Sequence, residues 1–124
     1  GDVGYMDEDG RIRINGRRKE IIIRGGENLS AREIDDNLVG CPGVGESATI
    51  GMPDDRLGER ICTFVAPLGD TVPTLESVTA YLEGEGVPKR LWPERIEIID
   101  EIPKTLMGKV RRNVLTDELA ARMA

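Results

Sequence analysis

The chain has 124 residues and a formal net charge of −6, which fits one domain that buries roughly two thirds of its unfolded surface. The acidic balance argues against a general nucleic-acid binder, and the absence of histidine excludes Ser-His and Cys-His nucleophile pairs. No apolar run reaches the ~18 residues that span a bilayer, and two cysteines, Cys41 and Cys62, are too few for a zinc site.

These features predict a cytoplasmic protein with reduced, structural thiols, no metal site and no membrane span. The chain begins inside a patterned segment, so we expect it to be a fragment of a longer protein. Residues 1–7 and 11–14 have the pattern of two short strands, and the turn between them ends at Gly10, which predicts an N-terminal hairpin. The charged residues 16–20 that follow predict an exposed connector.

Residues 21–24 form a β-branched strand pattern that ends at Gly25 and Gly26, where the backbone turns sharply or lets another molecule approach closely. Ser30 and Glu33 have the spacing of a capping box. They predict a helix that runs to about residue 40, with its buried face formed by Ile34 and Leu38.

The middle of the chain predicts an antiparallel hairpin, with strands at residues 48–52 and 60–67 and a turn-rich connector at residues 52–59. The preceding run Gly-x-Gly-x-x-Ala at residues 43–48 loosely matches a dinucleotide-binding fingerprint. It follows a helix terminator and leads into a strand, so we reject that interpretation.

Thr74 predicts the N-cap of a second helix, over residues 75–85. Strands are then expected at residues 95–99 and 109–112, before a last helix at residues 114–124. The apolar residues at helical spacing predict the buried faces of the two helices: Leu75, Val78 and Leu82 in one, and Leu115, Leu119 and Met123 in the other.

Between the last predicted strands lies a short loop that presents Lys109 after Pro103 and Gly108. Lys109, with the three further cations Lys104, Arg111 and Arg112, predicts a positive cluster that faces an anion such as a phosphate. The segment is not a P-loop, because Pro103 and Val110 stand where that motif requires glycine and Ser/Thr. The alternative interpretation is a surface lysine after a turn.

The run Pro-Lys-Thr-x-x-Gly-Lys-x-x-Arg, which contains Lys109, closely resembles the last signature of the adenylate-forming acyl-CoA synthetases. The resemblance implies that Lys109 reaches the α-phosphate and the substrate carboxylate while the acyl-adenylate forms. The opening Gly-Asp-x-Gly-x-x-Asp-x-Asp-Gly resembles the end of the large N-terminal domain in that family, and implies that Asp2 binds the ribose hydroxyls of ATP. An ordinary turn residue is the alternative for Asp2.

The charged connector resembles the hinge of the same family. The resemblance implies that Arg17 contacts the ribose or phosphates and that the torsions of Lys19 change as the small domain swings. The Gly-Gly-Glu-Asn run resembles the loop with which acyl-CoA ligases line the pantetheine tunnel, and it implies this role for Gly25, Gly26 and Glu27. A solvated charge run and a tight turn are the respective alternatives.

The chain departs from its relatives near Pro93. Synthetases commonly place a lysine two residues before this proline, and Leu91 stands there in this chain. Lys89 or Arg90 could supply the charge that contacts the phosphates of CoA, and Trp92 could offer a stacking face. A tryptophan half buried under a loop is the alternative.

Together these signatures imply an α+β fold, with a small central β-sheet flanked by helices and a separate N-terminal β-hairpin. Residues 1–17 would end the N-terminal domain and residues 18–124 would form a C-terminal lid domain. The implied reaction joins a carboxylic acid to CoA, with Mg²⁺-bound ATP and CoA as substrates and no tightly bound cofactor. We expect a fatty, alicyclic or aryl acid and no activity from the fragment alone. A domain that loads a carrier protein and a non-catalytic interaction module are the alternatives.

Overall fold

The computed structural model describes residues 5–7, 11–13 and 20–124. At its start, strands β1 (Tyr5–Asp7) and β2 (Arg11–Arg13) pair antiparallel, with Met6 opposite Ile12. The predicted N-terminal hairpin is therefore confirmed. In the part of the chain that is described, no helix has the length and apolar character that crossing a membrane requires.

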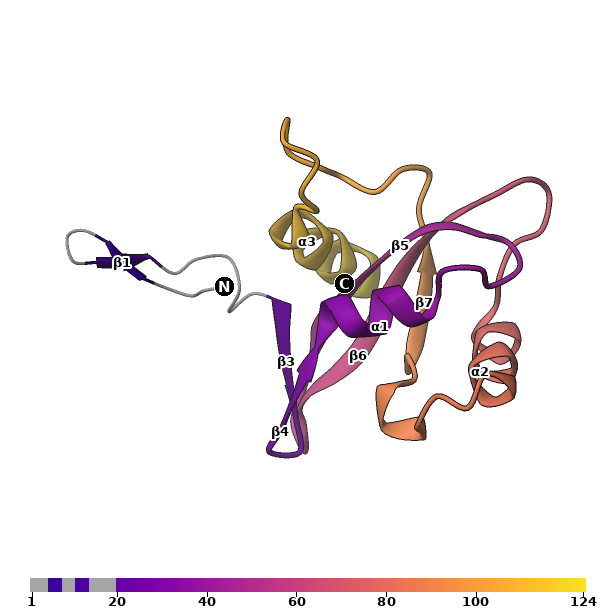
Figure 1. Ribbon diagram of the computed structural model, residues 1–124, viewed down its shortest axis with the longest axis horizontal. Coiled ribbons are helices and arrows are strands. Elements are labelled where there is room, and N and C mark those ends of the chain that lie inside the picture. Colours follow the sequence, from indigo (N-terminus) through magenta and orange to yellow (C-terminus); the bar gives the residue numbers. More distant parts are fainter. Residues whose placement is uncertain (1–4, 8–10, 14–19) are drawn as a thin grey trace.

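The centre of the main sheet is β6 (Gly58–Pro67), which pairs along its whole length with β5 (Val44–Asp54) in an antiparallel register (Figure 1). The predicted central hairpin is thus confirmed, but the predicted connector was too long. Both strands extend to a tight turn at residues 55–57. The side chain of Asp54 stabilises this turn by accepting hydrogen bonds from the backbone N–H groups of Arg56 at 3.1 Å and Leu57 at 2.8 Å.

The other edge of β6 is shared by two strands. β3 (Ile21–Arg24) meets it only where Arg24 lies opposite Gly58, and β7 (Arg95–Ile98) pairs with it in parallel further along. A strand that the sequence did not predict, β4 (Glu27–Ser30), pairs antiparallel with β3 and completes the five-stranded sheet.

Helices cover both faces of this sheet. The side chains of Cys62 and Phe64 pack with α3 (Arg112–Met123) on one face, whereas Ile61 packs on the other face with α1 (Ala31–Asn37). This alternation follows from the two-residue period of a strand. It explains why β6 is apolar from Ile61 onward except at Thr63, since both faces of this part of the strand are buried.

The third helix, α2 (Leu75–Gly84), packs its buried Val78 and Leu82 against Leu38 and Cys41. Both predicted N-caps are present: Ser30 Oγ accepts a hydrogen bond from Glu33 N at 3.1 Å, and Thr74 shares a complete capping box with Ser77. The capping box predicted at Ser30 is half formed, because among the described residues the Glu33 side chain does not bond back to the N–H of Ser30. The prediction was wrong for Leu75, which is 38% exposed because it borders an open hollow, and for Met123, which is 53% exposed at the end of α3.

Two further boundaries differ from expectation. The first helix ends at Asn37, not near residue 40. The predicted strand at residues 109–112 is a single bridge between Lys104 and Val110, because Arg112 already begins α3. Cys41 and Cys62 are free and buried, and burial raises the pKa of Cys62 to about 12.

Candidate functional site

The loop between β7 and α3 carries Lys109 and projects beyond the body of the domain (Figure 1). Its base is anchored by Ile102, which is 2% exposed, and by Val110, which packs on the core under α3. The N–H of Arg111 donates to the carbonyl of Pro103 at 2.9 Å and closes the loop. Lys109 itself is exposed, and its ammonium forms no ion pair with residues 20–124.

The predicted positive cluster was wrong for two of its four cations. Lys104 is paired with the carboxylate of Glu46. Arg112 turns into the interior, where its side chain is 11% exposed and its Nη2 lies 2.8 Å from Asp35 Oδ2. Of the predicted set, Lys109 and Arg111 are therefore the two exposed cations that form no ion pair with residues 20–124.

Arg112 belongs to a buried polar network that the sequence analysis missed. Its Nε donates to the carbonyl of Thr49 at 3.0 Å, and the hydroxyl of Thr49 lies 2.6 Å from Asp35 and 2.8 Å from the hydroxyl of Thr63. Burial raises the pKa of Asp35 to about 6 in spite of these hydrogen bonds. The available signal was the pair of threonines that interrupts two otherwise apolar strands.

Gly25 and Gly26 form the two-residue turn between β3 and β4, with φ of +58° and +84°. Positive φ at both positions is the geometry of the tight hairpin turn that glycine favours. A Cβ added at Gly26 would meet no atom within 4 Å, so this position borders open space. The predicted loop through Asn28 is shorter than expected, because Glu27 and Asn28 already pair with β3.

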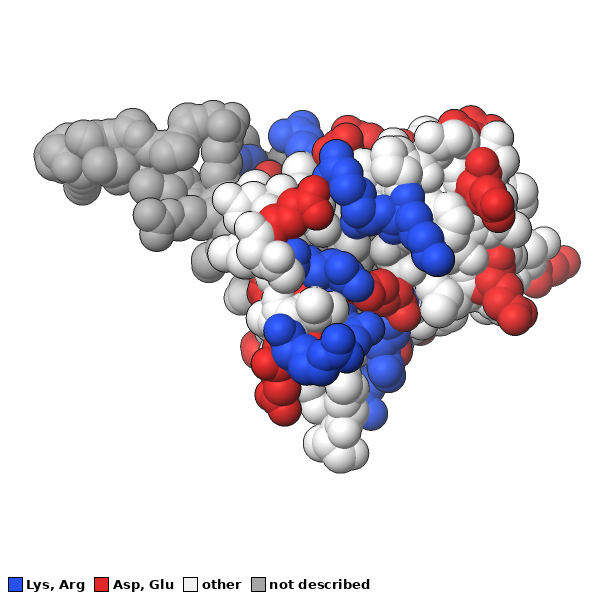
Figure 2. Space-filling view, turned by 90° about the horizontal axis from the view of Figure 1, so that it is seen from below, with Lys and Arg blue, Asp and Glu red and all other residues white. Residues whose placement is uncertain are grey.

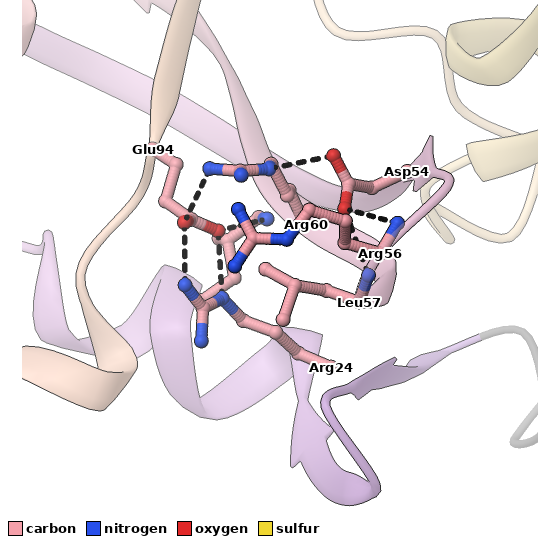
Figure 3. Close-up of polar contacts among 7 residues, drawn as sticks. Arg24, Asp54, Arg56, Leu57, Arg60 and Glu94 are labelled. Atoms are coloured by element: carbon pink, nitrogen blue, oxygen red, sulfur yellow. Dashed lines mark hydrogen bonds and ion pairs between the residues drawn. The ribbon is translucent and has the colours of Figure 1, made fainter.

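A carboxylate fixes this turn to the rest of the sheet (Figure 3). Arg24 donates to both oxygens of Glu94, at 2.9 and 2.8 Å, and Glu94 also accepts the N–H of Ile61 at 2.9 Å. The hydrogen bond from Arg24 holds the pKa of Glu94 below its ordinary value. Arg60 extends this network to Asp54, because its Nη1 lies 3.4 Å from Glu94 Oε2 and its Nε lies 2.8 Å from Asp54 Oδ1.

The structure brings Glu27 together with the predicted phosphate contacts. Lys89 and Arg90 lie in the 3₁₀ turn η2 (Lys89–Leu91), and Arg90 Nη1 is 2.8 Å from Glu27 Oε2. Seen from below in Figure 2, Lys and Arg side chains gather on this side of the domain, with Asp and Glu among them. A hollow of about 590 Å³ opens here, lined by Lys89, Arg90 and Trp92 among others.

Trp92 and Leu91 have structural roles in this segment. The indole Nε1 of Trp92 donates to the carbonyl of Val87 at 2.9 Å, and the ring is half-buried against the core that contains Leu82. Leu91 is 4% exposed and packs with Ile22. Where a charge was expected from the resemblance, this chain contributes an apolar core residue.

Three predicted site residues, Asp2, Arg17 and Lys19, lie outside the residues that the structure describes. The predicted groups that are described fall into two places. Lys109 lies on the projecting loop, whereas Gly25, Gly26 and Glu27 lie at the β3–β4 end of the sheet, beside Lys89 and Arg90. Figure 1 shows the loop and the turn at opposite ends of the domain.

The chain is similar to known proteins over nearly all of its length. The family described as "AMP-binding enzyme C-terminal domain" matches residues 33–109. The chain is 40% identical to the medium-chain fatty-acid–CoA ligase of Escherichia coli over 99% of its own length, and 35% identical to the 2,3-dihydroxybenzoate-AMP ligase of Bacillus subtilis over the same share. It spans 22% and 23% of those two proteins.

The fold is also similar to that of solved structures. A fatty acyl CoA synthetase of Mycobacterium tuberculosis superimposes with a TM-score of 0.75 and 33% identity, over 96% of this chain and 23% of that one. The similarity therefore covers nearly all of the present chain and less than a quarter of each relative.

Proposed function

Because the chain belongs to the AMP-binding enzyme C-terminal domain family, we propose that it is the lid domain of an ATP-dependent acyl-CoA ligase. In this proposal residues 1–17 end a large N-terminal domain, and residues 18–124 form the lid. The acid and most of the ATP site belong to that larger domain. The lid supplies one group to each of two successive reactions.

In the first reaction a carboxylate oxygen attacks the α-phosphorus of ATP, and pyrophosphate leaves. The ammonium of Lys109 neutralises charge that develops on the α-phosphate, while Asp2 binds the ribose hydroxyls and Arg17 contacts the ribose or phosphates. Mg²⁺ enters with ATP as part of the substrate. In the second reaction the thiol of CoA attacks the acyl carbonyl, and AMP leaves.

The observation that carries the proposal is the separation of the loop that carries Lys109 from the turn between β3 and β4 (Figure 1). A single pose of the lid cannot easily present both ends of the domain to one acyl-adenylate. A rotation about Lys19 would withdraw Lys109 after the first reaction and bring the turn to the second. Hinges of this kind need only a few residues that absorb the change in backbone torsion.

The surroundings of the turn support its proposed contact with CoA. Gly26 borders open space, which suits the passage of a narrow pantetheine arm beside Gly25 and Glu27. The hollow lined by Lys89 and Arg90 lies next to the turn, and these two cations would contact the phosphates of CoA.

A second candidate function is an adenylating domain that loads a carrier protein, because one relative, 38% identical over 94% of this chain, is named a fatty acid–[acyl-carrier-protein] ligase. Transfer of the acyl group to free CoA, as opposed to a carrier-bound pantetheine, distinguishes the two. A non-catalytic module of the same fold predicts that the full-length protein activates no acid with ATP.

The decisive experiment replaces Lys109 with alanine in the full-length protein. We expect pyrophosphate exchange to fall by about a hundred- to a thousandfold, as when one preorganised charge partner is lost, while thioester formation from preformed acyl-adenylate stays nearly intact. Lys104→Ala is the matched control, because that ammonium is in the same loop but is already paired with Glu46. Equal losses in both reactions would contradict the proposal.

A further inference from the structure

The hydrogen bonds at the tip of the Lys109 loop converge on one residue, Thr105. Its hydroxyl accepts hydrogen bonds from the backbone N–H groups of Met107, at 3.3 Å, and Lys109, at 3.2 Å. Its own N–H donates to the carbonyl of Lys109 at 2.8 Å, and its carbonyl accepts the N–H of Gly108 at 2.9 Å. Thr105 thus holds the turn from both its backbone and its side chain.

Packing cannot hold this tip. The two residues that follow Thr105 are apolar, and Leu106 is fully exposed while Met107 is 88% exposed. Only the base of the loop is buried, at Ile102. Beyond the base, the direction in which Lys109 leaves the main chain depends on polar contacts, and the N–H of Lys109 bonds to the Thr105 hydroxyl.

We infer that Thr105 is a positioning residue for Lys109: by accepting the N–H of Lys109, its hydroxyl fixes the backbone from which the ammonium extends. The inference rests on the proposed function of Lys109 and deepens it. Thr105 acts through Lys109 and contacts no substrate in this assignment. The hydroxyl contributes by preorganisation, because an ammonium that points in the wrong direction stabilises the charge developing on the α-phosphate poorly.

Thr105→Val in the full-length protein isolates the hydroxyl. Valine keeps the β-branched shape and the backbone hydrogen bonds, but leaves the N–H groups of Met107 and Lys109 to water. We expect the kcat of pyrophosphate exchange to fall by about tenfold, the equivalent of one or two net hydrogen bonds. The KM for ATP and the thioester reaction from preformed adenylate should stay within about twofold of wild type.

Thr105→Ser retains the acceptor and should restore pyrophosphate exchange to within about twofold of wild type. Thr116→Val is the matched control, because the exposed hydroxyl of Thr116 only donates to the carbonyl of Arg112 within α3. We expect that variant to keep the activity of the wild type in both reactions.

A readout independent of activity is amide hydrogen exchange of the peptide that covers residues 103–111 in the full-length protein. We expect faster exchange at this loop in Thr105→Val, and wild-type exchange in Thr105→Ser and Thr116→Val. Unchanged exchange and activity in Thr105→Val would overturn the inference, as would equal impairment of the valine and serine variants. Full activity of Lys109→Ala would instead overturn the proposed function, and the hydrogen-exchange result would still test the contact to Thr105.

Discussion

The Lys109 loop and the Gly25–Gly26 turn are held by contacts of different range. The loop closes on itself, through Thr105 to Lys109 and Pro103 to Arg111. The turn is fixed by partners far away in the sequence, since Arg24 binds Glu94, Glu27 binds Arg90, and the N–H of Gly25 donates to the carbonyl of Leu57 at 2.8 Å. The tip of the loop, from Thr105 to Lys109, is built locally, whereas the turn depends on the assembled sheet.

Because of this difference, substitutions at the two sites should have different effects on the fold. A change inside the loop should alter the placement of one ammonium and leave the remaining fold in place. A change in the partners of the turn should act on the packing of β3 against β6 as well as on the proposed contact with CoA. Variants at the two ends of the domain should therefore fall into two distinguishable classes.

Among variants at the turn, the largest effect is expected from Gly26→Leu in the full-length protein. A non-glycine residue at φ of +84° costs roughly 1–2 kcal/mol of backbone strain, and the side chain would fill the open space beside the turn. We expect thioester formation to fall more than about tenfold while pyrophosphate exchange is nearly unchanged, the reverse of Lys109→Ala.

Gly69→Leu is the control for backbone strain alone. Gly69 also has positive φ, at +75°, and a Cβ there would meet no atom within 4 Å. It lies in the loop before α2, away from the proposed CoA contacts. If both leucine variants lose thioester formation equally, the assignment of Gly26 to the pantetheine passage is wrong.

A smaller effect should follow from Glu94→Gln, which removes the charge that Arg24 and Arg60 share. We expect the free energy of unfolding of the 124-residue chain to fall by about 1–2 kcal/mol at pH 7, because these hydrogen bonds involve charged but partly exposed groups. Urea denaturation measures the change. Glu118→Gln, which alters an exposed pair within α3, should change it by less than about 0.5 kcal/mol.

The same variant carries a pH test. The folded pKa of Glu94 is lowered by Arg24, so its charge stabilises the fold above the unfolded pKa, about 4.3, and this contribution is lost as the pH falls through the folded pKa. The difference between wild type and Glu94→Gln should therefore shrink as the pH falls from 5 towards 3. A constant difference over this range would argue against a stabilising ionised Glu94.

The smallest effect is expected from Arg90→Ala. Its pair with Glu27 is about half exposed on both sides, so the free energy of unfolding should change by less than about 0.5 kcal/mol. Loss of one phosphate contact should raise the KM for CoA by about three- to tenfold without changing pyrophosphate exchange. Arg32→Ala, in the exposed face of α1, is the control, and an equal rise in KM there would contradict a specific contact.

The range of the contacts also explains which features could be predicted from the sequence. Helical spacing correctly identified the buried pairs Ile34 with Leu38 and Leu115 with Leu119, because neighbours on one helix face are set by local geometry. The exposed Lys109 was likewise predictable from its own loop.

Features that depend on distant partners were missed. The polar strand β4 carries little strand signal of its own and exists through its pairing with β3. The predicted cation cluster failed because Glu46 and Asp35, which neutralise Lys104 and Arg112, come from remote segments. Nothing in the local sequence distinguishes an arginine that will be buried from one that will face a ligand.

The guanidinium of Arg112 connects the base of the Lys109 loop to the segment that follows the proposed hinge. It starts α3, three residues after Lys109, and its Nη1 lies 3.5 Å from Glu20, which directly follows Lys19. Asp35 and Thr49 bind the same guanidinium. The base of the loop and the segment after the proposed hinge are therefore held together by one side chain. In the proposed function, a rotation at that hinge would therefore move the base of the Lys109 loop together with the sheet, as one rigid body.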